Sequence, residues 1–184
     1  METYISILRG INVSGHKMIK MEELRKVYET LKFKNVKTYI QSGNVVFKTT
    51  KAKTEELEKK IAKGISSAFG FEVPVLVIEA NELKRIAGSN SFVIKRNEDI
   101  TKLHVTFLST VPEKVKLDAM MPGNYANDEF VVSGKSIYLF CPGGYGNTKL
   151  SNNFFESKFK VTATTRNWKT VNELVKMAEE ISNG

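Results

Sequence analysis

Residues 38–47 read Thr38-Tyr39-Ile40-Gln41-Ser42-Gly43-Asn44-Val45-Val46-Phe47. β-Branched and aromatic residues occupy both ends of this stretch, and such residues favour strands. Ser42 and Gly43 stand between them, and glycine readily adopts the positive φ angle that tight hairpin turns require. The stretch therefore predicts a strand, a two-residue turn at Ser42-Gly43 and a second strand. The amides Gln41 and Asn44 flank this turn and are candidates for a binding role.

The periodicity of apolar residues extends this hairpin into a longer series of elements. Strands are predicted over residues 4–8, 73–78, 103–108, 130–133, 136–140 and 161–164. Helices are predicted over residues 21–31, 54–68, 81–87, 112–121, 150–159 and 170–181. Pro74 near the start of its strand favours a position at the edge of a sheet. Thr170 and Glu173 have the spacing of a capping box, which places the start of the last helix there.

This order gives the arrangement βαββαβ followed by a helix, and the second half of the chain repeats it. Two short matches support duplication: Ser42-Gly43 recurs as Ser133-Gly134, and Asn81-Glu82-Leu83 recurs as Asn172-Glu173-Leu174, at the same separation. The sequence therefore predicts an α+β fold of two ferredoxin-like units in tandem, with antiparallel sheets and helices packed on them. We assign the first unit to residues 1–90 and the second to residues 91–184, together forming one compact structural domain.

The 184-residue chain carries 28 Lys and Arg against 20 Asp and Glu, for a net charge of +8. A basic surface favours a polyanionic partner such as nucleic acid, although a lysine-rich surface also simply keeps a protein in solution. The single cysteine, Cys141, excludes an internal disulfide and is typical of a reducing compartment. No apolar run approaches the ~20 residues that cross a bilayer. We therefore expect a cytoplasmic protein with no membrane partner.

Three loops carry residue types that suit a binding site. Arg9 and Asn12 lie in a loop with glycines after the first strand. The glycine-rich stretch 142–149 can present backbone N–H groups and Lys149 to an anion at a helix start, or it is a plain turn. Arg166 can hold a phosphate or carboxylate in a fork, or it is a surface residue. The candidate binding residues are Arg9, Asn12, Gln41, Asn44, Tyr145, Lys149, Arg166 and Asn167.

Metal and nucleophile chemistry is not expected. His16, His104 and Cys141 lack the short spacings of a zinc site, so we predict no metal and no cofactor. We assign parallel directions to the first and third strands of the second unit, which would keep His104 and Cys141 too far apart for a nucleophile pair. An RNP1-like run is absent, so RNA binding across the sheet face is not expected.

The predicted topology also limits how the loops combine. In the first unit we expect Arg9 to Asn12 at one edge of the sheet and the turn from Gln41 to Asn44 at the other. In the second unit we expect the loop 143–149 and Arg166 at opposite edges. A composite site would then need loops from both units.

Four motifs together resemble the bacterial domain of unknown function 1697 family. They are Arg9-Gly10-Ile11-Asn12-Val13, residues 39–47, Tyr145-Gly146-Asn147-Thr148-Lys149-Leu150 and Thr164-Thr165-Arg166-Asn167-Trp168. The resemblance spans nearly the whole chain, and Ser14 departs from the glycine usual at its position. It implies a cytoplasmic α+β protein with a duplicated ferredoxin-like fold, and it implies no activity.

Three classes of function remain open. The first is a module that binds a phosphate-bearing ligand, either a nucleotide or nucleic acid. We favour it because of the net charge, the glycine-rich loop 142–149 and the Arg9 and Arg166 loops. The second is an enzyme acting on a small polar or anionic metabolite, for which no catalytic residue is assigned because no Asp, Glu or His lies inside the four motifs. The third is a protein-interaction module.

Overall fold

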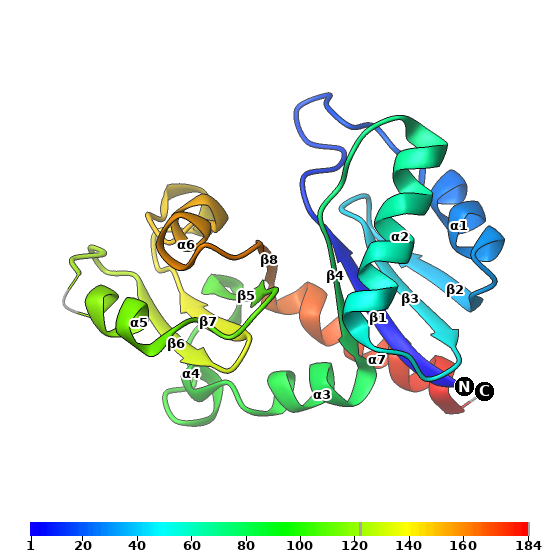
Figure 1. Cartoon of the computed structure of the whole chain (residues 1–184). Coiled ribbons are helices and arrows are strands. Elements are labelled where there is room, and N and C mark those ends of the chain that lie inside the picture. The colour runs from blue at the N-terminus through cyan, green and yellow to red at the C-terminus, as the bar shows by residue number, and fades with distance from the viewer. Residues whose placement is uncertain (122, 184) are drawn as a thin grey trace. The chain divides into compact units, whose positions relative to one another are not determined.

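The computed structural model describes residues 1–121 and 123–183 (Figure 1). Its strands are β1 (Glu2–Leu8), β2 (Lys34–Tyr39), β3 (Asn44–Thr49), β4 (Val75–Glu79), β5 (Leu103–Leu108), β6 (Glu129–Ser133), β7 (Ser136–Phe140) and β8 (Ala163–Asn167). Its α-helices are α1 (Met21–Thr30), α2 (Thr54–Phe69), α3 (Ala80–Gly88), α4 (Ser91–Ile94), α5 (Lys114–Met120), α6 (Asn152–Phe159) and α7 (Trp168–Asn183). Short 3-10 helices are η1 (Ile100–Lys102) and η2 (Tyr145–Asn147).

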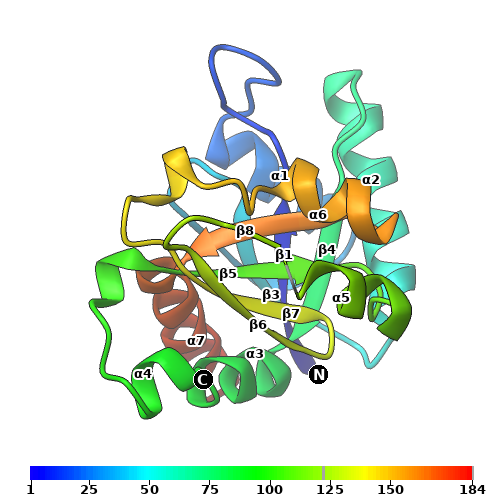
Figure 2. The same ribbon diagram turned by 90° about the vertical axis from the view of Figure 1, so that its left-hand side faces the viewer.

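The strands form two antiparallel four-stranded sheets with equivalent strand orders. The first sheet has the order β2-β3-β1-β4 and the second has the order β6-β7-β5-β8. Figure 2 shows the second sheet with its strands side by side. The predicted α+β class and the two tandem ferredoxin-like units are confirmed. Pro74 precedes β4, which lies at the edge of its sheet as expected.

The chain divides into two compact units. One contains residues 1–85 and 173–184, and the other contains residues 86–172. The C-terminal part of α7 therefore belongs with the first sheet, where Ser182 Oγ donates a hydrogen bond of 2.8 Å to Thr3 Oγ1 on β1. The first unit therefore contains residues from both ends of the sequence, whereas the predicted units were two consecutive segments divided between residues 90 and 91.

An aromatic cluster forms the centre of the first unit's core. Phe47 on β3 is fully buried, and its ring lies 4.5 Å from Phe33, 5.5 Å from Tyr28 and 5.9 Å from Tyr4, measured between centroids. The hydroxyls of Tyr28 and Ser6 share a buried hydrogen bond of 2.7 Å. Helices α1 and α2 supply further apolar side chains to this core, among them Leu24, Leu57, Ile61 and Ile65.

The hairpin between β2 and β3 has a longer turn than its sequence predicts. Strand pairing ends at Tyr39 opposite Asn44, so the turn contains four residues, 40–43, and not only Ser42-Gly43. Gly43 has φ +75°, but Ile40 also has a positive φ of +50°, which is a strained conformation for a β-branched residue. The strand propensity of Ile40 predicts that the strand continues through this residue, whereas β2 ends at Tyr39. Tertiary contacts outweigh this local propensity.

The second unit has its own core on the helical side of its sheet. Apolar residues of β7 and β5 pack there against α6, including Leu139, Leu108, Phe155 and Phe159. The opposite side carries Phe92, whose ring lies 5.9 Å from Phe140, and Arg96, whose guanidinium lies over both rings. Arg96 also forms a 2.7 Å ion pair with Glu129 on β6. Leu139 and Phe140, which are neighbours on β7, therefore face opposite sides of the sheet.

Candidate functional site

The first two predicted motifs meet at one end of the first sheet. Strand β1 runs antiparallel to β3 with Ile7 opposite Asn44, so the end of β1 lies beside the turn 40–43. The Leu8 amide donates a 2.9 Å hydrogen bond to the Gly43 carbonyl. The prediction that these loops lie at opposite edges was wrong, because adjacent antiparallel strands place the end of one next to the start of the other.

Asn12 holds the first loop in shape and joins it to the turn. Its Nδ2 donates to the backbone carbonyls of Ile19 (2.9 Å) and Gln41 (2.8 Å), and its Oδ1 accepts from the Ile19 amide (2.8 Å). The residue has φ +54°, a conformation that asparagine tolerates better than most residues. The amide of Asn12 is therefore occupied by loop structure in this conformation.

Asn44 is fully buried and serves the turn in the same way. Its Nδ2 donates to the Tyr39 carbonyl (3.1 Å) and to Ser42 Oγ (2.9 Å). Gln41 is exposed, and Arg9 is partly buried with its amide bonded to the Pro74 carbonyl at 3.0 Å. The motif's two asparagines thus have structural roles, while Arg9 and Gln41 carry the side chains that remain candidates for binding at this end.

The other two motifs meet in the second unit, again against expectation. Strand β5 is antiparallel to both of its neighbours: Leu103 lies opposite Phe140 on β7, and His104 lies opposite Asn167 on β8. The ends of β7 and β8 therefore flank the start of β5. The glycine-rich loop that follows β7 and the Arg166 segment of β8 consequently lie at the same end of the sheet.

His104 and Tyr145 form the aromatic part of this second group. Their rings are stacked with centroids 4.8 Å apart and planes inclined by 25°. Burial lowers the pKa of His104, with a weaker opposing effect from the Lys102 backbone. His104 Nδ1 is buried and makes no well-aligned hydrogen bond within the described residues. From the sequence, His104 was considered only as a metal ligand or as the partner of a nucleophile. Its stacking on Tyr145 could not be predicted without the register of β5.

Arg166 supplies the positive charge. Its side chain is partly buried, and one terminal guanidinium nitrogen donates to Thr164 Oγ1 (3.1 Å) and to the Thr165 carbonyl (2.9 Å). Burial lowers the pKa of Arg166 to about 10, whereas Tyr145 acts electrostatically in the opposite direction. The guanidinium therefore remains charged at neutral pH in surroundings that disfavour charge, within electrostatic range of Tyr145.

The glycine-rich loop uses its backbone groups internally. The amides of Gly144, Asn147 and Thr148 donate to the carbonyls of Cys141, Gly144 and Tyr145. Helix α6 begins only at Asn152, after Ser151, whose Oγ accepts from the Phe154 amide at 3.3 Å. These three amides are therefore used within the loop, where they help to position Tyr145, and are not presented to an anion. Lys149 is exposed, and in the part of the chain that the structure describes no ion pair joins it to this group.

Asn167 caps the last helix. Helix α7 begins at Trp168, and Asn167 Oδ1 accepts a 2.8 Å hydrogen bond from the Thr170 amide. The predicted start at Thr170 was therefore two residues late, since Asn167 and not Thr170 supplies the cap. Asn167 is exposed and lies opposite His104, so it stands at the same end of the sheet as Arg166.

Cys141 lies closer to His104 than the sequence suggested. Strands β5 and β7 are antiparallel, so the parallel assignment was wrong, and the Cys141 amide donates to the Lys102 carbonyl at 2.9 Å. Burial nevertheless raises the pKa of the Cys141 thiol to about 11, so the thiol is protonated at neutral pH. A thiolate nucleophile is disfavoured for this reason and not because of distance.

Residues 1–121 and 123–183 carry neither a metal-binding cluster nor a membrane-spanning helix. No group of three or more His, Cys, Asp or Glu side chains there is arranged to hold a metal ion. No helix in that part of the chain has the length and apolar character needed to cross a membrane.

Residues 1–138 match the model of a family described as "Protein of unknown function (DUF1697)". The chain belongs to this family. The match includes the two motifs of the first unit, as the sequence resemblance predicted. A search of curated proteins finds no match.

This DUF1697 protein is similar in fold to a solved structure, that of the conserved bacterial protein SP0830 from Streptococcus pneumoniae. The two chains share 22% identity with a TM-score of 0.75, over 96% of this chain and 98% of the other. The likeness extends over both units, whereas the DUF1697 match ends before Tyr145. It supports the fold of the second unit as well as that of the first.

A pH effect follows from the burial of His104. The unfolded chain protonates this residue near the ordinary histidine value, whereas the folded chain resists protonation, so stability is lost as pH falls through about 6.5 and below. We expect His104→Phe, which keeps a ring against Tyr145, to flatten the decline in melting temperature between about pH 7.5 and 5.5. The measurement is thermal unfolding at several pH values, with His16→Asn as the exposed control. An unchanged slope in His104→Phe would contradict this explanation.

Proposed function

We propose that the end of the second sheet binds a phosphate-bearing ligand, with Arg166 as its charged contact. The observation that carries the proposal is the guanidinium of Arg166, which donates to Thr164 Oγ1 and the Thr165 carbonyl in surroundings where burial lowers its pKa to about 10. A bound anion would offset the desolvation of this cation, and a planar guanidinium suits phosphate oxygens.

The stacked rings of His104 and Tyr145 support the same proposal. They place aromatic surface at the end of the sheet that carries Arg166, and such surfaces favour ligands that contain a base or sugar ring. The net charge of +8 would attract such anions from solution. A nucleotide needs few charged contacts, whereas a nucleic acid needs several, so the salt dependence of binding separates the two.

Ligand binding is expected to depend on Arg166 without a matching loss of stability. A nucleotide or short oligonucleotide at about 100 times its Kd should raise the melting temperature by about 5–10 °C, and Arg166→Gln should abolish this shift. The measurement is a thermal-shift series at low and moderate salt with inorganic phosphate, nucleotides, sugar phosphates and oligonucleotides. Lys169→Gln is the control, since Lys169 is exposed and lies three residues further along the chain.

The outcomes distinguish binding from a structural role. If Arg166→Gln unfolds more easily but keeps the ligand shift, Arg166 is structural and the proposal fails. If no phosphate compound raises the melting temperature of the wild-type chain, the proposal fails as well. A steep loss with salt for oligonucleotides alone would assign nucleic acid as the ligand class.

A further inference from the structure

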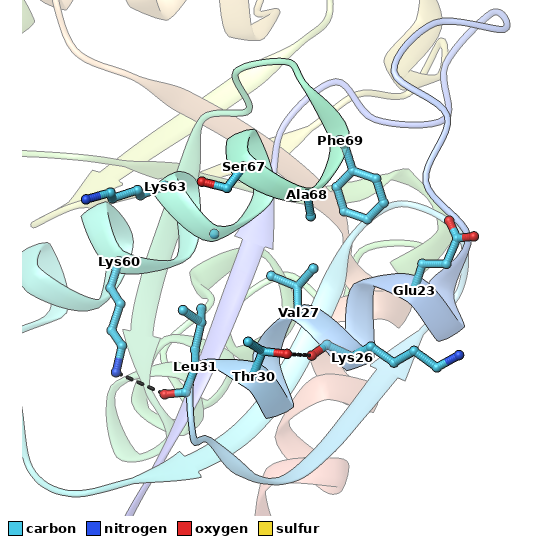
Figure 3. Close-up of a pocket in the computed structure, with 11 residues that line it drawn as sticks. Glu23, Lys26, Val27, Thr30, Leu31, Lys60, Lys63, Ser67, Ala68 and Phe69 are labelled. Carbon is cyan, nitrogen blue, oxygen red and sulfur yellow. Dashed lines mark hydrogen bonds between the residues drawn. The ribbon is translucent and has the colours of Figure 1, made fainter.

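A groove lies between α1 and α2 in the first unit, apart from the predicted motifs (Figure 3). Its volume is about 760 Å³. One wall carries Val27 on α1 and Leu31, the residue that follows α1. The other wall carries Ala68 and Phe69 on α2. All four side chains are at least partly exposed to solvent, so the floor of the groove presents apolar surface.

Gly64 allows the two walls of the groove to approach closely at its floor. A Cβ atom at Gly64 would lie 3.2 Å from Val27 Cγ1 and 3.2 Å from Leu31 Cδ1. Glycine is a poor helix former, yet it stands inside the 16-residue helix α2. Because it carries no side chain, the apolar groups of α1 reach the backbone of α2 and remain accessible from the groove.

The rim of the groove is predominantly basic. Lys26, Lys60 and Lys63 line it together with one carboxylate, Glu23, and Lys26 is ion-paired with Glu22 at 2.9 Å. Lys60 Nζ donates to the Leu31 carbonyl at 3.0 Å, which holds this ammonium at one end of the groove. Lys63 is exposed and makes no ion pair with any residue that the structure describes. An apolar floor with a basic rim complements an apolar ridge flanked by carboxylates.

We propose that this groove binds an acidic amphipathic helix of a partner protein. The lining runs from Glu23 to Leu31 on one wall and from Lys60 to Phe69 on the other. This corresponds to about 13–15 Å of helix, which accommodates two to three turns of a third helix. Apolar side chains at positions i, i+4 and i+7 would lie on the floor, and Glu or Asp on either side would face the lysines. The groove is concave between two helices, so it fits a helical ridge better than a flat bilayer surface. This proposal is independent of the phosphate site.

The probe for this proposal is a labelled synthetic helix of about 14 residues with Leu at i, i+4 and i+7 and Glu on both flanks. Fluorescence polarisation with the full chain should give a Kd below about 100 μM. Ala68→Glu places a carboxylate on the floor and Lys63→Glu reverses the charge of the rim, so each should weaken binding at least about tenfold. Both positions are exposed, and each variant should keep the thermal stability of the wild type.

Matched controls test charge and location separately. Lys59→Glu makes the same charge change on α2 at an exposed position outside the groove, and it should leave the affinity within about twofold. A peptide with Lys in place of every Glu should bind at least about tenfold more weakly. The proposal is overturned if the acidic peptide does not bind or if Ala68→Glu leaves its affinity unchanged. Dodecanoate, a fatty acid, is the probe for a lipid ligand. The proposal is also overturned if dodecanoate binds in the groove and the peptide does not.

Discussion

Replacement of Phe47 by alanine is expected to lower the free energy of unfolding by about 3–5 kcal/mol. Phe47 is fully buried and contacts three other aromatic rings, so its removal takes apolar area out of the core and leaves a cavity among rigid neighbours. The corresponding fall in melting temperature is about 6–20 °C for a chain of this length. Urea denaturation followed by far-ultraviolet circular dichroism measures the change, because the single tryptophan, Trp168, lies in the other unit.

A matched substitution shows whether burial is the cause. Phe71→Ala removes the same side chain from a half-buried ring that stacks on Phe69 at 6.1 Å, and should cost about half as much or less. Similar losses for Phe47→Ala and Phe71→Ala would contradict the role given to the buried cluster.

Gly43→Ala is expected to be the second most destabilising change, at about 2–5 kcal/mol. Gly43 has φ +75°, and an added Cβ would lie 2.7 Å from Leu8 Cβ and 2.8 Å from Ile11 Cδ1. The substitution therefore combines left-handed backbone strain with overpacking against the end of β1. Thermal and urea unfolding measure the loss.

Gly70→Ala separates these two contributions. Gly70 has φ +77° but nothing within 4 Å of the added Cβ, so only the backbone strain of about 1–2 kcal/mol remains. The difference between the two variants reports the crowding at Gly43. If Gly43→Ala and Gly70→Ala are equally destabilising, the close approach of β1 to the turn does not constrain the hairpin.

These predictions concern the contacts that also assemble the candidate sites. Gly43 joins the turn to the end of β1, and Asn12 joins the following loop to the Gln41 carbonyl. A change at Gly43 is therefore expected to displace the Arg9 loop as well as to weaken the core. In the second unit the same strand arrangement brings Tyr145 to His104 and places Arg166 within electrostatic range of Tyr145.

Several candidate residues have neighbours in the structure that differ from those predicted from the sequence. Arg9 and Gln41, and likewise Tyr145 and Arg166, were expected at opposite edges of their sheets, whereas each pair lies at one end of its sheet. The error came from strand direction, since β1 with β3 and β5 with β7 are antiparallel neighbours. Asn12, Asn44 and Asn167 were predicted as candidate binding residues, and in the structure their side-chain hydrogen bonds stabilise loops and a helix start.

The amino-acid sequence by itself determined most of the helices and strands, the duplicated α+β class and the family. These depend on local propensity and on the period of apolar residues, which act over a few positions along the chain. The tertiary structure alone decided which loops meet, that the C-terminal part of α7 joins the first unit, how burial shifts the pKa of His104 and Arg166, and that a groove lies between α1 and α2. Each of these depends on contacts between residues far apart in sequence, because desolvation and side-chain packing are properties of the assembled neighbourhood.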